Sequence, residues 1–243
     1  MRGQVCAGVM CFLLAFASPC GFAGPPFFTD DPAPVDYHHW EFYLASLQEY
    51  AGHAATATLP HVEVNYGALQ NVQLHLLAPM AYLHTSEGTH YGYAATEIGV
   101  KYRFVEETGN IPQIGTFPLV EIPTGDANLT GGKVQAYIPL WLQKSWGKFT
   151  TYGGGGFWYN PGPDMKNWTF VGWQAQYDFS DALSLGGELY FHTADQNDAQ
   201  AGAAFNAGGF INIDANNHVL CSIGHSFYGE VATTAYLGYQ YTL

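Results

Sequence analysis

Apolar and polar side chains alternate along most of this chain with a period of two residues. In the segment TEIGVKYRF, Ile98 and Val100 share one face, whereas Glu97 and Lys101 share the other. A period of two is that of a β-strand with one apolar and one polar face. The pattern predicts an all-β chain of about twelve strands, at residues 39–50, 59–68, 71–83, 92–105, 112–122, 133–144, 148–159, 168–179, 182–192, 202–214, 218–228 and 232–243.

The expected strands and their connections indicate an antiparallel transmembrane β-barrel. Most strands are close to the roughly 9–11 residues that a tilted strand needs to cross the hydrocarbon layer. Counted from the first strand, the odd-to-even connections are mostly long and polar: 51–58, 84–91, 123–132, 160–167, 193–201 and 229–231. The even-to-odd connections are mostly short: 69–70, 106–111, 145–147, 180–181 and 215–217. Bacterial barrels have short periplasmic turns and long outer loops, so both termini are expected to be periplasmic.

Aromatic residues fall near both ends of the expected strands, as in the two girdles of membrane proteins. At the expected periplasmic ends they are Trp40, Phe104, Trp146, Phe149, Phe179 and Tyr241, and at the outer ends Tyr50, Tyr82, Tyr93, Trp158, Trp168 and Phe227. Three prolines inside strands predict local bulges: Pro79, Pro118 and Pro139. A secreted, soluble all-β sandwich or barrel is the alternative, and it explains the alternation but neither the loop lengths nor the girdles.

The chain begins like an exported protein. Arg2 precedes an apolar run over residues 7–17 and small residues up to Ala23, which predicts a signal peptide at residues 1–23. Acylation of Cys20, as in a lipoprotein, is disfavoured by the preceding Pro19. Cleavage after Ala23 leaves Cys221 as the remaining cysteine, so no internal disulfide is expected.

A proline-rich segment after the signal peptide and an acidic composition bear on the domain organisation and on the binding partners. Residues 24–38 are rich in proline, and we expect them to form an N-terminal segment in the periplasm. One hypothesis is that this segment folds into the mouth of the barrel, which residues 39–243 are expected to form. With 7 Lys plus Arg against 20 Asp plus Glu, the chain lacks the basic surface that binds nucleic acid. The expected location is the outer membrane, with its lipids as partners.

Several segments resemble a family of outer-membrane transporters labelled MetA-pathway of phenol degradation. They are PPFFTDDPAPVDYHHWEFYL, TEIGVKYRF, FPLVEIPTGD, IPLWLQKSWGKFTTYGGGGFWYNPG, FVGWQAQYDFSDALSLGGELYFHTA and TAYLGYQYTL. The resemblance implies a barrel, transport of a small aromatic or hydrophobic solute, and no catalytic residues. The last strand also resembles the signal read by the outer-membrane insertion machinery, although Leu243 replaces the more usual Phe.

Three motifs suggest other chemistry, and each is incomplete. His84 and Ser86 resemble the His-x-Ser motif of outer-membrane phospholipase A, but Glu87 replaces the usual Asn and residues 92–105 contain no Asn to orient the imidazole. A lipid esterase therefore remains the enzymatic alternative. The run of four glycines at 153–156 lacks the Lys-Ser/Thr of a phosphate loop. Ten histidines show no metal-ligand spacing, so neither a metal nor a cofactor is expected.

The polar phase of the strands supplies the candidate lumen-lining residues. They are Glu97, Lys101, Arg103, Glu121, Gln174, Gln176, Asp178, Glu188 and His192. Such a set either fills a closed, structural barrel as a polar network or lines an open pore and sets its selectivity. The sequence leaves both open, and the predicted function is a passive channel or transporter for small molecules.

Overall fold

The computed structural model describes residues 25–243, so the predicted signal peptide lies outside the described residues. Fourteen strands form one antiparallel sheet. They are β1 (Trp40–Ala51), β2 (Ala54–Leu69), β3 (Val72–Thr85), β4 (Gly88–Tyr93), β5 (Thr96–Val105), β6 (Gln113–Thr116), β7 (Leu119–Ile122), β8 (Gln135–Trp146), β9 (Phe149–Tyr159), β10 (Trp168–Ser180), β11 (Leu183–His192), β12 (Gly202–Asn212), β13 (Asn217–Tyr228) and β14 (Ala232–Thr242). Within these residues, no helix is long and apolar enough to span a membrane.

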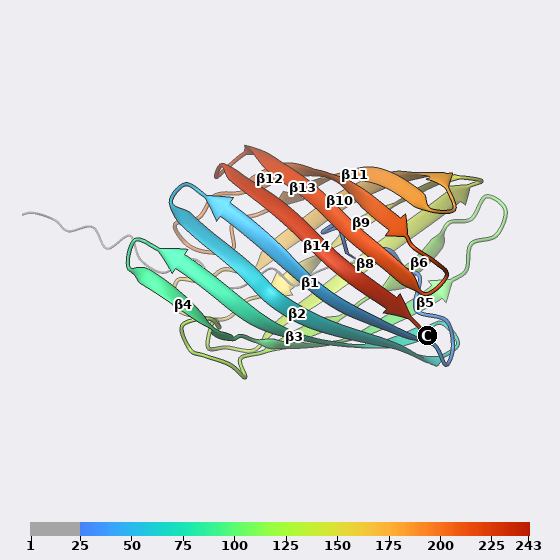
Figure 1. Cartoon of the computed structure of the whole chain (residues 1–243). Helices are drawn as coiled ribbons and strands as arrows, with labels where there is room; N and C mark the ends of the chain where they lie inside the picture. Colours follow the sequence, from blue (N-terminus) through green and yellow to red (C-terminus); the bar gives the residue numbers. More distant parts are fainter. Residues whose placement is uncertain (1–24) are drawn as a thin grey trace, which may run out of the picture.

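The sheet closes on itself, because β1 pairs with β14 over eleven residue pairs from Glu41–Thr242 to Ala51–Ala232. Figure 1 shows the resulting barrel, with strands strongly tilted to its long axis. Closure leaves no free sheet edge, which is what a strand structure in lipid requires.

Two of the twelve positions around the barrel are each occupied by two strands. β4 and β5 both pair with β3, and β6 and β7 both pair with β5 and β8. The prediction of twelve barrel strands is therefore confirmed, with one break at residues 94–95 and another at residues 117–118.

The three strand prolines behave differently. Pro118 lies in the break between β6 and β7, and Pro79 lies opposite a register shift in β2 between Thr58 and His61. Pro139 produces no bulge, since its ladder with Gly156 is continuous. Its carbonyl accepts a hydrogen bond from Thr116 Oγ1, so the side that lacks a donor faces the break between β6 and β7.

The predicted lengths of two connections are wrong. The predicted long connections 51–58 and 84–91 are mostly strand, because β1–β2 and β3–β4 are joined through two residues each. Residues 54–58 read Ala-Ala-Thr-Ala-Thr, whose small side chains give little polar contrast, so the alternation there was not evident. Residues 123–134, 160–167 and 193–201 do form long connections.

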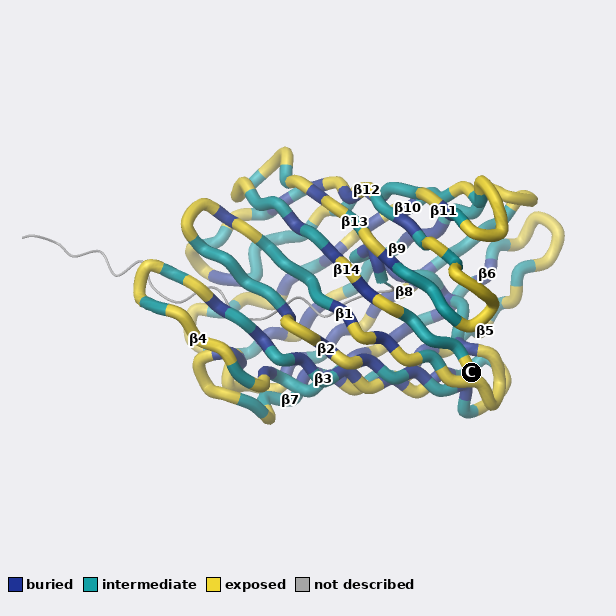
Figure 2. The backbone as a smooth tube through the Cα atoms, viewed as in Figure 1, coloured by how far each residue is buried: buried dark blue, intermediate teal, exposed yellow. Residues whose placement is uncertain are grey.

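The outer face of the barrel is apolar and the inner face is polar. Ile98, Val100 and Leu189 are exposed, whereas Glu97 and Glu188 on the same strands are buried. Figure 2 shows the alternation of buried and exposed positions along the strands. A soluble barrel would place these faces the other way round, so the soluble alternative does not fit.

The expected aromatic girdles are correct in part. Trp40, Phe104, Trp146 and Phe179 are exposed. Trp158 and Trp168, expected in the outer girdle, instead face the interior and stack on each other with centroids 5.5 Å apart. They lie directly opposite each other on β9 and β10, and both side chains face inward. A position near the end of a strand does not by itself reveal which way the side chain faces.

Candidate functional site

The N-terminal segment lies inside the barrel, and we call residues 25–36 the plug segment. Figure 1 shows its trace within the ring of strands. Ser222 Oγ on β13 donates a hydrogen bond to the Pro26 carbonyl at 2.6 Å. The Val35 amide donates to Gln73 Oε1 on β3 at 2.9 Å. Strands on different sides of the lumen therefore hold the segment at both of its ends.

Glu188 holds the middle of the plug segment. Its two carboxylate oxygens accept hydrogen bonds from the amides of Phe28, at 2.8 Å, and Thr29, at 2.7 Å. Asn206 Nδ2, directly opposite on β12, donates to the same carboxylate at 2.7 Å. Three donors on a buried carboxylate make a strong, charge-assisted anchor.

Lys101 forms a second anchor. Its Nζ lies 3.0 Å from Asp30 Oδ1 and 3.8 Å from Asp31 Oδ1, and it sits over the Phe117 ring at 5.0 Å from the centroid. The Lys101 and Asp30 side chains are 7% and 0% exposed. Breaking a buried pair on one side leaves an uncompensated charge, so this contact favours a bound plug segment.

A buried polar network continues along β2, β3 and β5. His75 Nε2 lies 2.9 Å from Glu97 Oε1, and His75 Nδ1 lies 2.8 Å from Asn65 Oδ1. Asn65 Nδ2 donates to Glu63 Oε1 at 2.7 Å. Glu121 on β7 pairs directly with Glu97 across the strands. Each of these groups faces the lumen, where hydrogen bonds take the place of water.

All nine predicted lumen residues lie on the inward phase, but they do not form one ring. Buried are Glu97, Lys101, Glu121, Gln174 and Glu188, and half-buried are Arg103, Gln176, Asp178 and His192. Lys101 and Glu188 contact the plug segment, whereas Asp178 accepts a hydrogen bond from Ser184 Oγ at 2.6 Å. Arg103, near the end of β5, donates hydrogen bonds to the side chains of Asn71 and Gln113. Gln174 donates to Gln176 at 3.1 Å, and the His192 ring lies edge-on to Trp168. Their role in selectivity stays a prediction.

Several inward-facing polar residues are not among the nine predicted ones. Glu63 and Asn65 alternate with Val62 and Val64, and His75 lies in a similar pattern on β3, so the same period-two signal was present there. Asp30 carried no such signal, because it belongs to an irregular proline-rich segment whose place in the barrel is set by tertiary contacts.

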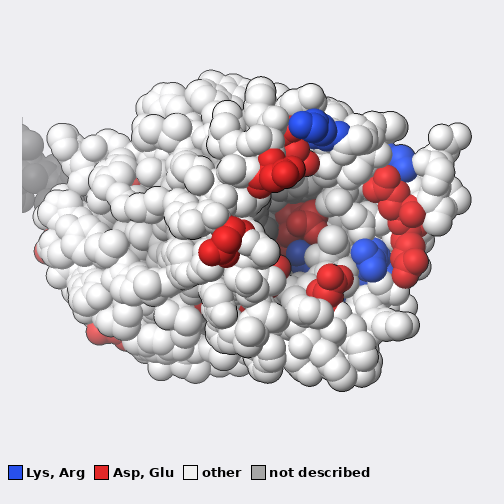
Figure 3. Space-filling model, turned by 45° about the vertical axis from the view of Figure 1, so that its right-hand side comes forward, with Lys and Arg blue, Asp and Glu red and all other residues white. Residues whose placement is uncertain are grey.

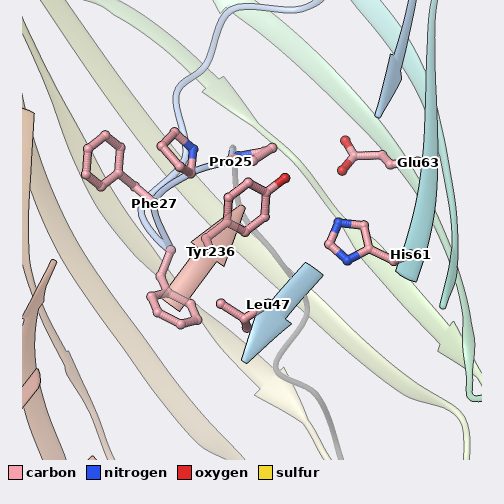
Figure 4. Close-up of a pocket in the computed structure, with 8 residues that line it drawn as sticks. Pro25, Phe27, Leu47, His61, Glu63 and Tyr236 are labelled. Carbon is pink, nitrogen blue, oxygen red and sulfur yellow. The ribbon is translucent and has the colours of Figure 1, made fainter. Parts of the chain in front are cut away.

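The plug segment packs tightly against the wall at its start. Figure 4 shows Pro25, Leu47, His61 and Tyr236 around one small space. The volume enclosed there is about 10 Å³, about the smallest space that holds one water molecule. The lumen is therefore filled at this level.

A larger cavity lies between the plug segment and the wall. Its volume is about 390 Å³, and it is lined by Asp30, Asp36, Glu41, Lys101 and neighbouring residues. Gln240 and Thr242 of the last strand also line it, which places it towards the end of the barrel that carries the C terminus. Figure 3 shows a hollow with acidic side chains around it as this end turns forward.

An ion pair fixes the rim at the same end, in the connection between β5 and β6. Lys144 Nζ donates a hydrogen bond to Glu107 Oε1 at 2.8 Å and another to the Gly109 carbonyl at 2.6 Å. The hydrogen bond from Lys144 lowers the pKa of the Glu107 carboxyl below its usual value. The β5–β6 connection is thereby tied to the adjacent strand β8.

The motifs set aside in the sequence have ordinary structural surroundings. His84 Nδ1 lies 2.8 Å from Thr89 Oγ1, its cross-strand partner, and among the described residues no hydrogen bond joins His84 to Ser86. The four glycines lie in β9, where a Cβ on Gly154 would overlap the Leu140 carbonyl. Within residues 25–243, no group of three His, Cys, Asp or Glu is arranged to hold a metal ion.

Comparison with known proteins supports the fold. The chain is similar to the crystal structure of the COG4313 outer membrane channel from Pseudomonas putida F1, with a TM-score of 0.71 and 13% identity, covering 88% of this chain and 98% of that one. It is also similar to the NanC porin, with a TM-score of 0.59 and 7% identity over 83% of this chain and 100% of that one. For the KdgM porin in complex with disordered oligogalacturonate the TM-score is 0.55 and the identity 9%, over 82% and 98% of the two chains.

Those structures share the fold of an outer-membrane barrel with this chain. No family model and no curated protein sequence matches the chain. The resemblance to the phenol-degradation family therefore stays a prediction.

Proposed function

We propose that this protein is an outer-membrane β-barrel that passes small molecules by diffusion and carries its own plug. The observation that carries the proposal is the closed barrel with an apolar exterior and a polar interior that holds a separate segment of chain. A polar interior is typical of barrels that conduct solutes. The plug segment is held by side-chain hydrogen bonds, an ion pair and packing rather than by strand pairing, so its departure would leave the wall intact.

The topology and processing follow from the same proposal. Trp40 and Leu243 are joined by backbone hydrogen bonds in both directions, so the barrel strands begin and end at the same rim. We place that rim in the periplasm, with signal-peptide cleavage after Ala23 and β14 as the strand read by the insertion machinery. The short turns at this rim support that orientation.

The solute class suggested by the sequence is a small aromatic or hydrophobic molecule. The similar structures are channels and porins rather than enzymes, which supports a protein without catalysis and disfavours the His84/Ser86 esterase. A closed, structural barrel is the second candidate, and the tight packing around Phe27, Leu47 and Tyr236 favours it.

A swelling assay with proteoliposomes tests the proposal against the closed barrel. We expect a small neutral sugar to enter liposomes that contain the full-length mature protein, and to enter faster with Glu188→Ala, which removes the acceptor for the Phe28 and Thr29 amides. Asp178→Ala is the matched control, because Asp178 also faces inward but bonds Ser184 within the wall. If no variant admits the sugar, the structural barrel is correct and the channel is not.

A further inference from the structure

The cavity at the C-terminal rim has the size of a ligand site and opens at this end of the barrel. Its volume of about 390 Å³ falls within the roughly 300–1,000 Å³ of small-molecule pockets. The plug segment forms one side through Asp30, Asp31 and Asp36, and the barrel wall forms the other through Glu41, Tyr43 and their neighbours. The site is therefore built from two parts of the chain that are far apart in sequence.

Carboxyl groups dominate the lining of this cavity. They are Asp30, Asp31, Asp36, Glu41 and Glu63, and the basic side chains among the lining residues are Lys101 and His39. Lys101 is already engaged, at 3.0 Å from Asp30 and 3.8 Å from Asp31. Among the described residues, no ion pair joins Asp36 or Glu41 to a basic side chain. Five carboxyl groups against one lysine and one histidine give the cavity an acidic lining.

One of these carboxyl groups has an unused acceptor. Asp30 is fully buried, and its Oδ1 accepts hydrogen bonds from Lys101 Nζ at 3.0 Å and from the Asp31 amide at 2.7 Å. Its Oδ2 is buried without a hydrogen-bond partner. A buried acceptor left unpaired is costly, at about 1–3 kcal/mol. Because Oδ2 itself has no accessible surface, Asp30 acts on the cavity through its charge rather than through a direct contact.

Aromatic rings complete the lining. Tyr43, Phe117, Tyr152 and Phe210 all border the cavity. Phe117 already carries a cation over its face, since Lys101 Nζ lies 5.0 Å from the ring centroid. Carboxylates combined with aromatic faces are the recognition elements of organic ammonium ions.

We infer that this cavity binds a small organic cation with an ammonium head group. The carboxylates supply charge, the rings supply contacts to the methyl or methylene groups around the nitrogen, and the volume admits more than a bare metal ion. An ammonium solute differs from the aromatic or hydrophobic class that the sequence suggests. Its passage through the barrel rests on the proposed function, whereas binding itself does not require conduction.

Calorimetric titration of the refolded full-length mature protein in detergent tests the binding. The probes are choline and its neutral carbon isostere 3,3-dimethylbutan-1-ol, which have the same shape and differ in charge. We expect choline to bind and the alcohol to bind at least about tenfold more weakly, because the cation–π attraction requires the charge. Equal binding of both probes, or binding of neither, would overturn the inference.

Charge variants locate the site. The double variant Asp31→Asn/Asp36→Asn should weaken choline binding about tenfold. Each partly exposed carboxylate is expected to contribute about threefold to the affinity. Glu87→Gln/Asp198→Asn is the matched control, because it removes two carboxylates from connections at the other end of the barrel. If the Asp31 substitution loosens the plug segment, Glu41→Gln on β1 makes the same test from the wall. Equal losses in the control and the test variants would contradict the assignment.

Separate measurements test the binding of an ammonium ion and the proposed function as a channel. Reversal potentials in a planar bilayer with a salt gradient report conduction and its charge preference independently of calorimetry. A barrel that binds choline but never conducts contradicts the proposed function and leaves the binding site standing. A barrel that conducts, shows no preference for cations and does not bind choline contradicts the inference alone.

Discussion

Lys101 is the residue at which the barrel wall and the plug segment depend most directly on each other. Its amine is buried against Asp30 and is reached by no other lumen carboxylate at an equally short distance in residues 25–243. With Lys101 removed, Asp30 can keep its place only as an unpaired buried charge or by taking up a proton. Breaking a buried pair on one side typically costs about 3–5 kcal/mol. Release of the plug segment into water relieves that cost.

The first prediction follows from this dependence. Lys101→Met should increase the exchange rate of the Phe28 and Thr29 amides with solvent deuterium, because the plug segment spends more time outside the lumen. Lys101→Met/Asp30→Asn should restore protection, since the double variant leaves no unpaired charge. Mass-spectrometric hydrogen exchange on the plug peptide measures both. Protection that is equal in wild type and Lys101→Met would show that the ion pair does not hold the segment.

At the scale of single residues, the sequence predicts side-chain direction well where the strand alternation is strong. Glu97 and Lys101 face inward and Ile98 and Val100 outward, as their alternation requires. Contacts between residues distant in sequence are not encoded in that way. The partnership of Asp30 with Lys101, 71 positions apart, depends on how a proline-rich segment folds back into the barrel.

Strand β9 shows why an element of this barrel needs glycine. Gly153, Gly154, Gly155 and Gly156 face β8 and β10 so closely that a Cβ on any of them would overlap neighbouring backbone or side-chain atoms. Gly154 also has a φ of +153°, a conformation that side chains rarely adopt. Trp141 of β8 and Trp158 of β9 itself pack in the interior and are 0% and 2% exposed. The glycines thus allow bulky rings to fill the lumen on this side.

The second prediction concerns this element. Gly154→Ala should lower the free energy of unfolding by about 2 kcal/mol, because the methyl group meets the Leu140 carbonyl in a strained conformation. Gly92→Ala is the control, since its Cβ would make ordinary contact, 3.4 Å from Leu129. Urea unfolding in lipid vesicles, followed by tryptophan fluorescence, compares the two. Equal stability of both variants would remove the steric explanation for the glycine run.

At the scale of elements, the count of strands was predictable and their interruptions were only partly so. Pro118 signalled the break between β6 and β7, because proline lacks the ladder donor. The break between β4 and β5 has no proline: Ala94 instead donates its amide to the Pro79 carbonyl. That bond depends on the neighbouring strand, and the local sequence does not reveal it.

The whole molecule combines a closed wall with a separable interior. The wall is continuous from β1 round to β14, and the plug segment contributes no strand to it. Conduction therefore requires movement of the plug segment and leaves the strand pairing intact. Such a barrel can be stable and still open, which reconciles the filled lumen with the proposed channel.

Single-channel conductance of a locked plug tests this account most directly. A Cβ on Gly172 of β10 would meet the Thr29 hydroxyl, so Thr29→Cys/Gly172→Cys, with Cys221→Ser, can join the plug segment to the wall by a disulfide. Cys221→Ser alone is the control. The account predicts discrete current steps for the control, none for the oxidised locked protein, and recovery of the steps after a reducing agent is added. Current steps of unchanged size and frequency in the oxidised protein, with the disulfide verified by mass spectrometry, would contradict the account of a movable plug segment.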